Sequence, residues 1–506
     1  MERQPTARSV LRPSGRGAVL LAALCLAPAA SGEAQSLAAG PEIEISLAGA
    51  LRYDGSAPAL AAGPDGGFLC SWWNLGFKTR AVSPTDVPLS LVRKLDPSHY
   101  GHIAPVGPGR YVAAWSDDGN LIAQFLNAAG ELAGAPLTLA EGAELAQLIG
   151  IPSGGFAAAW SSSLGPSSPL PSRYLIRSFD AQGQPLGDAI DLGPLDGLSS
   201  LALLPDGFVV AWSTSLLPGG FGTQENFAQL FRADGSPAGA RIALAADADN
   251  PISEPHIGVD STGRFFIAWS EYPMPRVWAR RFSSTGQPLG APILVGGTAG
   301  RIPYVSGVAA RPDGSFLVEW GESPAVSSDT WPGWGVVQAR AYDAAGTPLG
   351  PSFLVHTDED GQPYGGEAAA TSDGWIVSWA RVHSGAGIYA RRFTLSCGTA
   401  SGLCLHGQRF RAEVAWRVPA TGAEGAGTPI PLTGDTGGFW FFSPANYELV
   451  VKVLDGRGVN GHFWVFYGSL TDVEFDLTIT DTQTGQQRTY HNPAGTMASR
   501  ADTEAF

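Results

Sequence analysis

The chain has 506 residues, of which 44% are hydrophobic, and it contains 66 Gly, 39 Pro and 15 Trp. This composition excludes a disordered chain and predicts a turn-rich, folded all-β protein with room for one large and one small domain. The formal net charge of −15 argues against nucleic acid or an anionic lipid surface as a partner.

The N-terminus has the pattern of an export signal. Four arginines precede the apolar stretch 17–30, and small residues follow up to Ala34. We therefore expect residues 1–34 to be a signal peptide and the mature protein to be secreted or periplasmic. Its removal leaves 27 basic residues against 44 acidic ones. No later stretch of the sequence is long and apolar enough to span a membrane.

One pattern occurs seven times between residues 60 and 393: a Gly-containing turn, a short apolar run and a tryptophan. The tryptophans are Trp72, Trp115, Trp160, Trp212, Trp269, Trp320 and Trp379. Their spacing of 43 to 59 residues suits one four-stranded sheet per repeat, which predicts a seven-bladed β-propeller over residues 40–396. Because the apolar runs are nearly continuous, we expect these strands to be covered on both faces and the tryptophans to pack between blades.

The seventh repeat is incomplete. It has a third strand at 387–393 but no fourth strand after it. Residues 40–49 (GPEIEISLAG) resemble residues 350–357 (GPSFLVHT), which form the last strand of the sixth repeat. We therefore predict that residues 42–48 supply the outer strand of the last blade and close the ring.

Residues 397–506 have a different pattern. Six or seven short, partly alternating segments, separated by Gly, Asn and Asp turns, predict a small antiparallel β-sandwich. In an oxidising compartment we expect a small disulfide loop between Cys397 and Cys404 at the domain boundary. Cys70 lies in an apolar run, where we expect a buried free thiol.

The repeat resembles a family of secreted bacterial propeller repeats of the form GGFVVVW…IYGQRFDADGNPLG…F.V, over roughly residues 40–393. The tail that begins with LCLHGQRFRAEVAW resembles a C-terminal module carried by exported proteins of environmental bacteria. This resemblance implies export and a scaffold, and it implies no set of catalytic residues.

Sequence motifs for catalysis and metal binding are weak. The sequence has no complete sialidase Asp-box, nucleophile elbow, Walker loop or zinc-binding helix motif, so we expect no cofactor. Asp358 and Asp360 are weak calcium candidates, because the run TDEDGQ does not complete the D-x-D-x-D-G pattern. Four glutamates near predicted strand ends are expected to be solvated or at the rim: Glu271, Glu319, Glu322 and Glu367. Since paired carboxylates from different blades leave no local signature, an exported glycoside hydrolase or lyase with a site in the central funnel is the alternative function.

The loops after the recurring Trp vary from SDDG to GESPAVSSDTWPGWG, and variable loops on a constant scaffold usually carry binding specificity. Trp331 and Trp334 are the leading ligand-binding candidates, since exposed rings stack on sugars or anchor proteins; folding back over the blade edge is an equally weighted alternative. Six further residues are predicted on this rim: Phe221, Tyr272, Arg301, His356, Tyr364 and His383. We expect a monomeric, non-catalytic binding or adhesion scaffold for a glycan or protein, with the sandwich as an alternative module for attachment to the cell surface.

Overall fold

The computed structural model describes most of the chain from residue 36 onward. The described ranges are 36–46, 58–63, 66–96, 101–151, 154–162, 173–194, 198–215, 224–232, 236–245, 255–271, 274–324, 335–357, 363–371, 373–381, 386–396, 402–406, 409–433, 435–444, 446–482 and 484–506. Within these ranges the regular structure is β-strand apart from one short helix, α1 (Arg457–Asn460). The all-β class is confirmed.

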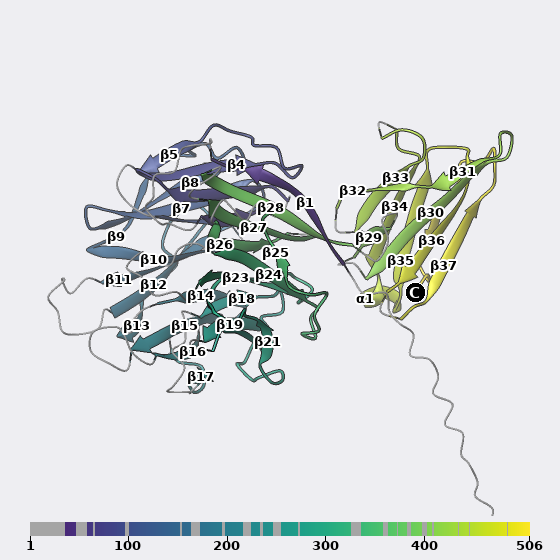
Figure 1. The fold of residues 1–506 in the computed structure, drawn as a ribbon. Coiled ribbons are helices and arrows are strands. Elements are labelled where there is room, and N and C mark those ends of the chain that lie inside the picture. The colour runs from purple at the N-terminus through teal and green to yellow at the C-terminus, as the bar shows by residue number, and fades with distance from the viewer. Residues whose placement is uncertain are drawn as a thin grey trace, which may run out of the picture.

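Seven four-stranded antiparallel sheets form a propeller (Figure 1). The first blade contains β2 (Ala59–Ala62), β3 (Phe68–Trp73), β4 (Phe77–Val82) and β5 (Arg93–Asp96), and the second contains β6 (Gly101–Pro105), β7 (Arg110–Asp117), β8 (Asn120–Asn127) and β9 (Leu137–Glu141). The third contains β10 (Ala143–Gly150), β11 (Phe156–Ser162), β12 (Arg173–Phe179) and β13 (Ile190–Pro194), and the fourth contains β14 (Ser200–Leu204), β15 (Gly207–Ser215), β16 (Gln224–Arg232) and β17 (Ile242–Ala245). The fifth contains β18 (His256–Val259), β19 (Phe265–Glu271), β20 (Arg276–Phe282) and β21 (Ile293–Gly296), and the sixth contains β22 (Arg301–Ala310), β23 (Phe316–Pro324), β24 (Val336–Tyr342) and β25 (Phe353–Leu354). The seventh is β26 (Pro363–Ala370), β27 (Gly374–Arg381), β28 (Gly387–Ser396) and β1 (Ser36–Glu44). The first strands of successive blades contact one another all the way round, β26 with β2 included, so they surround the propeller axis.

The recurring tryptophans lie between blades, as predicted. All seven are at most 6% exposed, and each belongs to a hydrophobic cluster shared with the preceding blade. Trp320 on β23, for example, packs with Phe266 and Val295 of the fifth blade. A Cβ added at Gly296 of that blade would lie 2.5 Å from the Trp320 ring, so the ring rests directly on the neighbouring backbone.

Replacing Trp320 by Ala is expected to lower the free energy of unfolding by about 3–5 kcal/mol, because a cavity would open between two blades. Denaturant unfolding followed by circular dichroism measures this loss. Leu91 is 86% exposed, and Leu91→Ala is the control, expected to stay within about 0.5 kcal/mol of the wild type. Equal stability of the two variants would show that Trp320 does not carry inter-blade packing.

The N-terminal strand closes the ring, as predicted. β1 pairs with β28 (Figure 1), and in this ladder Ile43 is the partner of Ala390. The strand runs from Ser36 to Glu44 and not over 42–48, because β28 extends to Ser396 and pairs along nearly its whole length. Beyond the strand, the Ile45 and Ser46 amides still donate to the Ile388 carbonyl at 2.8 and 3.3 Å.

The Glu42 carboxylate ties β1 to two blades at once. One oxygen accepts the backbone N–H and the hydroxyl of Thr357 in the sixth blade, at 2.6 and 2.8 Å. The other accepts the Arg381 guanidinium of the seventh blade at 2.6 Å, and Arg381 lies 4.2 Å above the centre of the Tyr389 ring. Partial burial acts in the opposite direction, but the bonds from Thr357 and Arg381 hold the pKa of Glu42 below its ordinary value.

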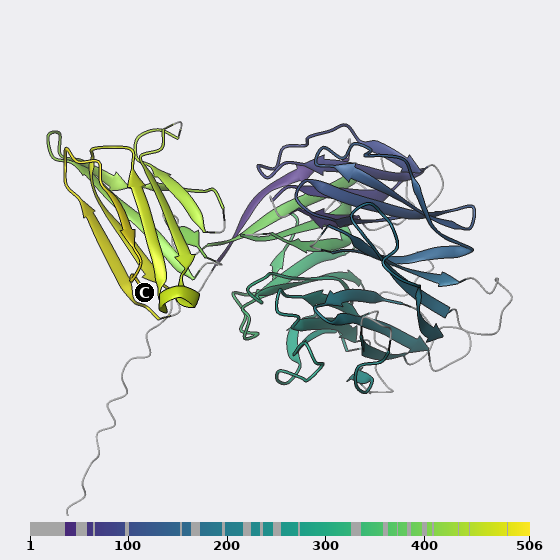
Figure 2. The same cartoon turned by 180° about the vertical axis from the view of Figure 1, so that it is seen from behind.

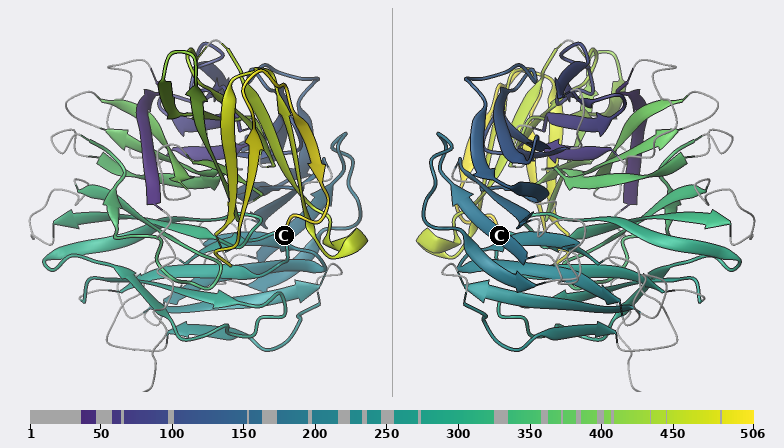
Figure 3. Two further views of the ribbon diagram at one scale, coloured as in Figure 1. Left: turned by 90° about the vertical axis from the view of Figure 1, so that its right-hand side faces the viewer. Right: turned by 90° about the vertical axis from the view of Figure 1, so that its left-hand side faces the viewer.

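The C-terminal region is an antiparallel β-sandwich, as predicted, and it forms a second body beside the propeller (Figure 2). The views of Figure 3 look along the line that joins the two bodies, so the sandwich overlaps the propeller there. One sheet contains β29 (Leu403–Leu405), β30 (Phe410–Val418), β31 (Ala423–Ala426), β36 (Glu474–Asp481) and β37 (Gln487–Asn492). The other contains β32 (Thr428–Pro431), β33 (Thr436–Trp440), β34 (Leu449–Asp455), β35 (Phe463–Ser469) and β38 (Ser499–Asp502). One hydrophobic cluster fills the space between the sheets, with Val451, Val465 and Leu477 fully buried in it.

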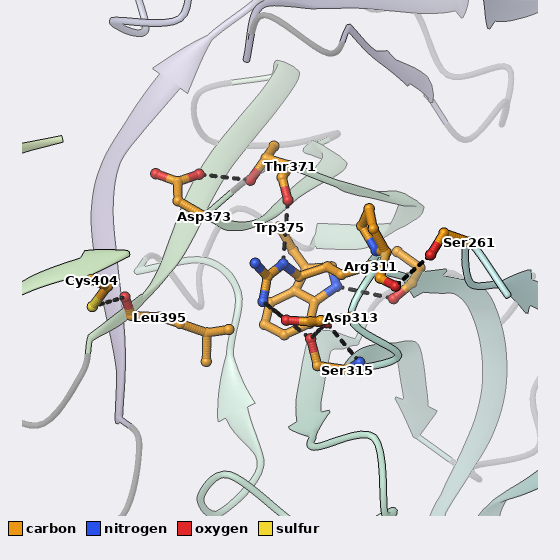
Figure 4. Close-up of polar contacts among 11 residues, drawn as sticks. Ser261, Arg311, Asp313, Ser315, Thr371, Asp373, Trp375, Leu395 and Cys404 are labelled. Carbon is orange, nitrogen blue, oxygen red and sulfur yellow. Dashed lines mark hydrogen bonds and ion pairs between the residues drawn. The ribbon is translucent and has the colours of Figure 1, made fainter. Parts of the chain in front are cut away.

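The two domains meet where β28 leads into β29. Cys404 is disulfide-bonded, and Cys397, its predicted partner, lies outside the described residues. The Cys404 sulfur lies 3.8 Å from the Leu395 carbonyl oxygen near the end of β28 (Figure 4). Cys70 is a buried free thiol, as the sequence indicates.

Candidate functional site

The first strands of the blades place one residue each at the same level of the propeller axis. We find this level in each blade by strand register. The first aromatic residue of the second strand has a partner on the first strand, and the level is three residues before that partner. In the first blade, Phe68 pairs with Ala62, so Ala59 lies at the level. The seven positions, which we call the axial ring, are Ala59, His102, Gln147, Ser200, His256, Gly307 and Glu367. Five of the seven are polar, so the centre of the propeller contains several hydrogen-bonding groups.

Side chains of the axial ring bond to the blade that follows. The Ser200 hydroxyl accepts the backbone N–H of Ile257 at 3.1 Å. A Glu367 carboxyl oxygen accepts the backbone N–H of Leu60 at 2.9 Å, across the junction between the seventh and first blades. These polar groups therefore satisfy backbone amides that face the axis and have no strand partner.

In the sixth blade, the polar side chain at the level of the axial ring comes from the second strand and not from the first. The residue before each recurring Trp is Ala or Ser in six repeats and Glu319 in the sixth. Glu319 lies directly across the ladder from Gly307, and directly opposed side chains share one face of a sheet. A Cβ at position 307 would lie 3.4 Å from Glu319 Oε2 and 3.0 Å from the Ala368 amide. Glycine at 307 thus makes room for the acid.

Glu319 is fully buried and connects the sixth blade to the seventh. Its Oε1 accepts the backbone N–H of Gly366 at 3.3 Å, and the neighbouring Tyr304 hydroxyl accepts that of Gly365 at 3.5 Å. Glu319 Oε2 and Ser306 Oγ are buried without a hydrogen-bond partner among the described atoms. A hydrogen bond between the two would satisfy both groups, but one donated by Ser306 stabilises the ionised acid, so the neutral form of Glu319 depends on burial.

The pKa values at the centre follow from burial. Burial raises the pKa of Glu319 to about 8, against the opposing Gly366 hydrogen bond and with the help of the Glu367 charge. Burial also raises the pKa of Glu367 to about 7. It lowers the pKa of His102, and it lowers that of His256 to about 4. At neutral pH the centre therefore holds a protonated Glu319 and two uncharged imidazoles.

This arrangement suits joining blades better than acid–base chemistry. A glycosidase needs two carboxyl groups that flank a substrate bond and keep oxygens free to meet it. Glu319 and Glu367 each direct an oxygen to a backbone amide of the next blade. Among the described residues, no group of three or more His, Cys, Asp or Glu is placed to hold a metal ion.

The expectation that the candidate glutamates are solvated is wrong for two of them. Glu319 and Glu322 are both fully buried. β23 continues past Trp320 to Pro324, so the residues after the Trp are still inside a sheet. Glu322 Oε1 accepts the indole N–H of Trp320 at 2.9 Å. Glu271 and Glu367 are half-buried.

Three of the predicted rim residues are described, and none of them is fully exposed. Arg301 is half-buried at the start of β22 and donates to the Glu322 carbonyl at 3.4 Å. The prediction that His356 lies on the exposed rim is wrong, since it is only 2% exposed. Its Nε2 accepts the backbone N–H of Val337 at 3.2 Å and holds the ring inside the blade. Tyr364 is half-buried against the cluster between the seventh and first blades. The other predicted binding and calcium residues lie outside the described ranges: Phe221, Tyr272, Trp331, Trp334, Asp358, Asp360 and His383.

Polar side chains also join blades at the opposite, hairpin-turn end of the propeller. Arg311, at the end of β22, is 2% exposed. It donates to Asp313 Oδ2 at 2.9 Å within its own turn and to the Thr371 carbonyl of the seventh blade at 3.3 Å (Figure 4). Burial lowers the pKa of Arg311. The Trp375 indole N–H adds a bond to the Ala309 carbonyl at 3.0 Å.

No protein-family model and no curated protein matches this chain. Similar solved structures include a protein of unknown function from Dyadobacter fermentans DSM 18053, with 13% identity over 71% of this chain and 99% of that one and a TM-score of 0.41. They also include U3-55K (11% identity, 71% and 98% covered, TM-score 0.44) and the Dos1 propeller (12%, 71% and 95%, 0.40). The propeller assignment rests on the sheet topology, and these similarities assign no function. Within the described ranges, no helix has the length and hydropathy needed to cross a bilayer.

Proposed function

We propose that the protein is a secreted, non-catalytic scaffold that binds a glycan or a protein at the cell envelope through the variable loops of its propeller. The observation that carries this proposal is the use of the axial polar groups. Glu319, Glu367 and Ser200 accept backbone amides of neighbouring blades, so the central polar chemistry holds the ring together. The signal-like residues 1–34 support export.

The connections between second and third strands support a binding role at one end of the propeller. In the second blade this connection is only residues 118–119, between β7 and β8. In the third blade it is residues 163–172, and in the sixth blade 325–335. A constant set of blades with such unequal connections is typical of scaffolds that present binding loops.

Binding by these loops is testable with the full-length protein on a glycan array and against envelope proteins. Replacing Trp331 and Trp334 together by Ala is expected to weaken ligand binding about tenfold or more, because buried aromatic residues dominate most interfaces. Leu289→Ala is the control. Leu289 lies in the connection between β20 and β21 of the fifth blade, at the end of the propeller opposite the second-to-third-strand connections, so this variant is expected to leave binding unchanged. Unchanged binding by the double variant would move the site away from this loop.

An exported carbohydrate-active enzyme is the second candidate. It is favoured by one observation: two carboxyl groups with raised pKa values, Glu319 and Glu367, interact with each other in the centre, and Tyr304 interacts with Glu319. Turnover of a polysaccharide by the wild type, lost in Glu367→Gln, would replace the scaffold proposal. The scaffold proposal predicts no turnover by either protein.

A further inference from the structure

The two outer faces of the C-terminal sandwich differ in chemistry. On the sheet that contains β30, β36 and β37, outward side chains form polar pairs between and along strands. Arg417 contacts Glu474, and the Thr478 and Thr489 hydroxyls are 3.1 Å apart. Such paired polar groups are usual for a sheet face that meets water.

The outer face of the other sheet is largely apolar and aromatic. On β35 the residues Phe463, Val465 and Tyr467 are buried in the core, so the alternating residues between and after them point outward. The same alternation applies to β34 and β38. The outward residues on these three strands are Val450, Lys452, Leu454, Trp464, Phe466, Gly468, Ser499 and Ala501. Val450, Leu454, Trp464 and Phe466 are half-buried. Partly exposed apolar side chains gathered on one face are typical of interaction sites.

A trough crosses this face perpendicular to the strands. Val450, Gly468 and Ser499 lie opposite one another on three adjacent strands, and Gly438 on the fourth strand, opposite Val450, is covered by the Tyr447 ring. Two strand spacings give the open row a length of about 10 Å. A hollow of about 470 Å³ lies over this part of the sheet, with Phe466 in its wall.

The aromatic rings beside the trough are held in place by the protein itself. A Cβ at Gly438 would lie 2.9 Å from the Tyr447 ring, and a Cβ at Gly456 would lie 2.0 Å from the Trp464 ring, so both rings rest on glycine backbone. The Trp464 indole N–H donates to Asn460 Oδ1 at 2.8 Å. Rings fixed in this way lose little conformational entropy when a ligand stacks on them.

The charge on this part of the face comes from Lys452, whose side chain is exposed on the outer face. Arg500 also lines the hollow, but it lies opposite Tyr467 on the inner face, with its guanidinium 5.4 Å from the centre of the Tyr490 ring. No carboxylate is among the described residues that line the hollow. An exposed cation without a neighbouring carboxylate favours an anionic ligand.

We propose that this trough binds a segment of an acidic polysaccharide, with a sugar ring against Phe466 and a sugar carboxylate beside Lys452. The small residues along the row allow a chain of sugar rings to approach the sheet closely. A stable protein partner would need about 800 Å² of matching surface on each side, much more than this narrow trough offers. The site is separate from the propeller loops, and it would attach the sandwich to an envelope or extracellular matrix rich in uronic acids.

Calorimetric titration of the full-length protein with polygalacturonate tests this site, with methyl-esterified polygalacturonate as the uncharged comparison. Gly468→Val is the informative variant. Its Cβ would lie 3.7 Å from Ser499 Oγ, an ordinary contact, and valine suits a strand, so the fold and thermal midpoint are expected to be retained. Because the added side chain fills the trough, binding is expected to weaken about tenfold or more.

Two further variants complete the test. Lys452→Gln is expected to reduce the preference for the acid over its ester, and Thr478→Val on the opposite outer face is expected to change nothing. Full-strength binding by Gly468→Val, or absence of binding to both polymers, would overturn the proposal. Binding of polyglutamate in place of both polysaccharides would overturn it in favour of an acidic protein. Loss of polygalacturonate binding in the Trp331, Trp334 double variant, with Gly468→Val unaffected, would place the glycan on the propeller.

Discussion

Deleting residues 35–50 is expected to open the propeller and remove its cooperative unfolding transition. Among the described strands, β1 forms the outer strand of the seventh blade. Ile43 and Ile45 on and beside this strand are buried between the seventh and first blades, and their burial contributes about 4 kcal/mol. The bonds from Glu42 to Thr357 and Arg381 are lost with them. The combined loss is a large part of the free energy of unfolding of a typical protein, which is about 5–15 kcal/mol.

Differential scanning calorimetry measures the effect of this deletion, with a chain that begins at residue 35 as the matched control. The control retains β1 and is expected to unfold like the mature protein. The deletion variant is expected to lose the propeller transition while the transition of residues 403–506 stays in place. A propeller transition of unchanged midpoint in the deletion variant would show that the ring does not need β1.

Glu319→Gln is expected to abolish most of the loss of stability that the wild type shows above neutral pH. The folded protein binds the Glu319 proton with a pKa of about 8, against 4.5 for the free side chain. Its contribution to stability is therefore full below pH 4.5 and is lost as pH rises to about 8; the contribution of Glu367 is lost by about pH 7. The glutamine amide keeps the acceptor for Gly366 and offers a permanent N–H to Ser306, so it mimics the protonated acid.

The axial histidines act in the opposite direction and set the pH window. The pKa of His256 is lowered from 6.5 to about 4 in the folded protein, so its contribution is full above pH 6.5 and is lost as pH falls toward 4. His102 acts in the same sense. Between pH 4.5 and 6.5 acids and imidazoles oppose each other. Above pH 6.5 only the acids respond, and Glu319 alone accounts for a decline of about 2 kcal/mol up to pH 8.

The repeating features of this fold are predictable from the sequence because they depend on local patterns. The spacing of the tryptophans, the turn residues and the apolar runs each describe one blade, and seven similar blades form a ring when their faces pack together. The missing fourth strand of the last repeat also has a visible complement near the N-terminus. The bounds of β1 are less predictable, since they depend on the length of β28 across the ladder.

The axial ring depends on register between strands and between blades, which no local pattern contains. A comparison of equivalent repeat positions would nevertheless have found its unusual member. Glu319 replaces Ala or Ser before the Trp, and Gly307 replaces a larger residue opposite it. The sequence predicts a rim position for His356 because it begins the connection between the sixth and seventh blades. β25 is only two residues long, however, and His356 accepts the Val337 amide inside the blade.

The central claim is that the buried Glu319 joins the sixth blade to the seventh as a neutral hydrogen-bonding group. The most direct test is the free energy of unfolding of the wild type and Glu319→Gln at pH 6.5 and pH 8.5, with the exposed-strand variant Glu424→Gln as the control. If Glu319 joins the blades as a neutral acid, the free energy of unfolding should decline by about 2 kcal/mol between pH 6.5 and pH 8.5 in the wild type and in Glu424→Gln. The decline should be much smaller in Glu319→Gln. An equal decline in all three proteins would contradict the claim.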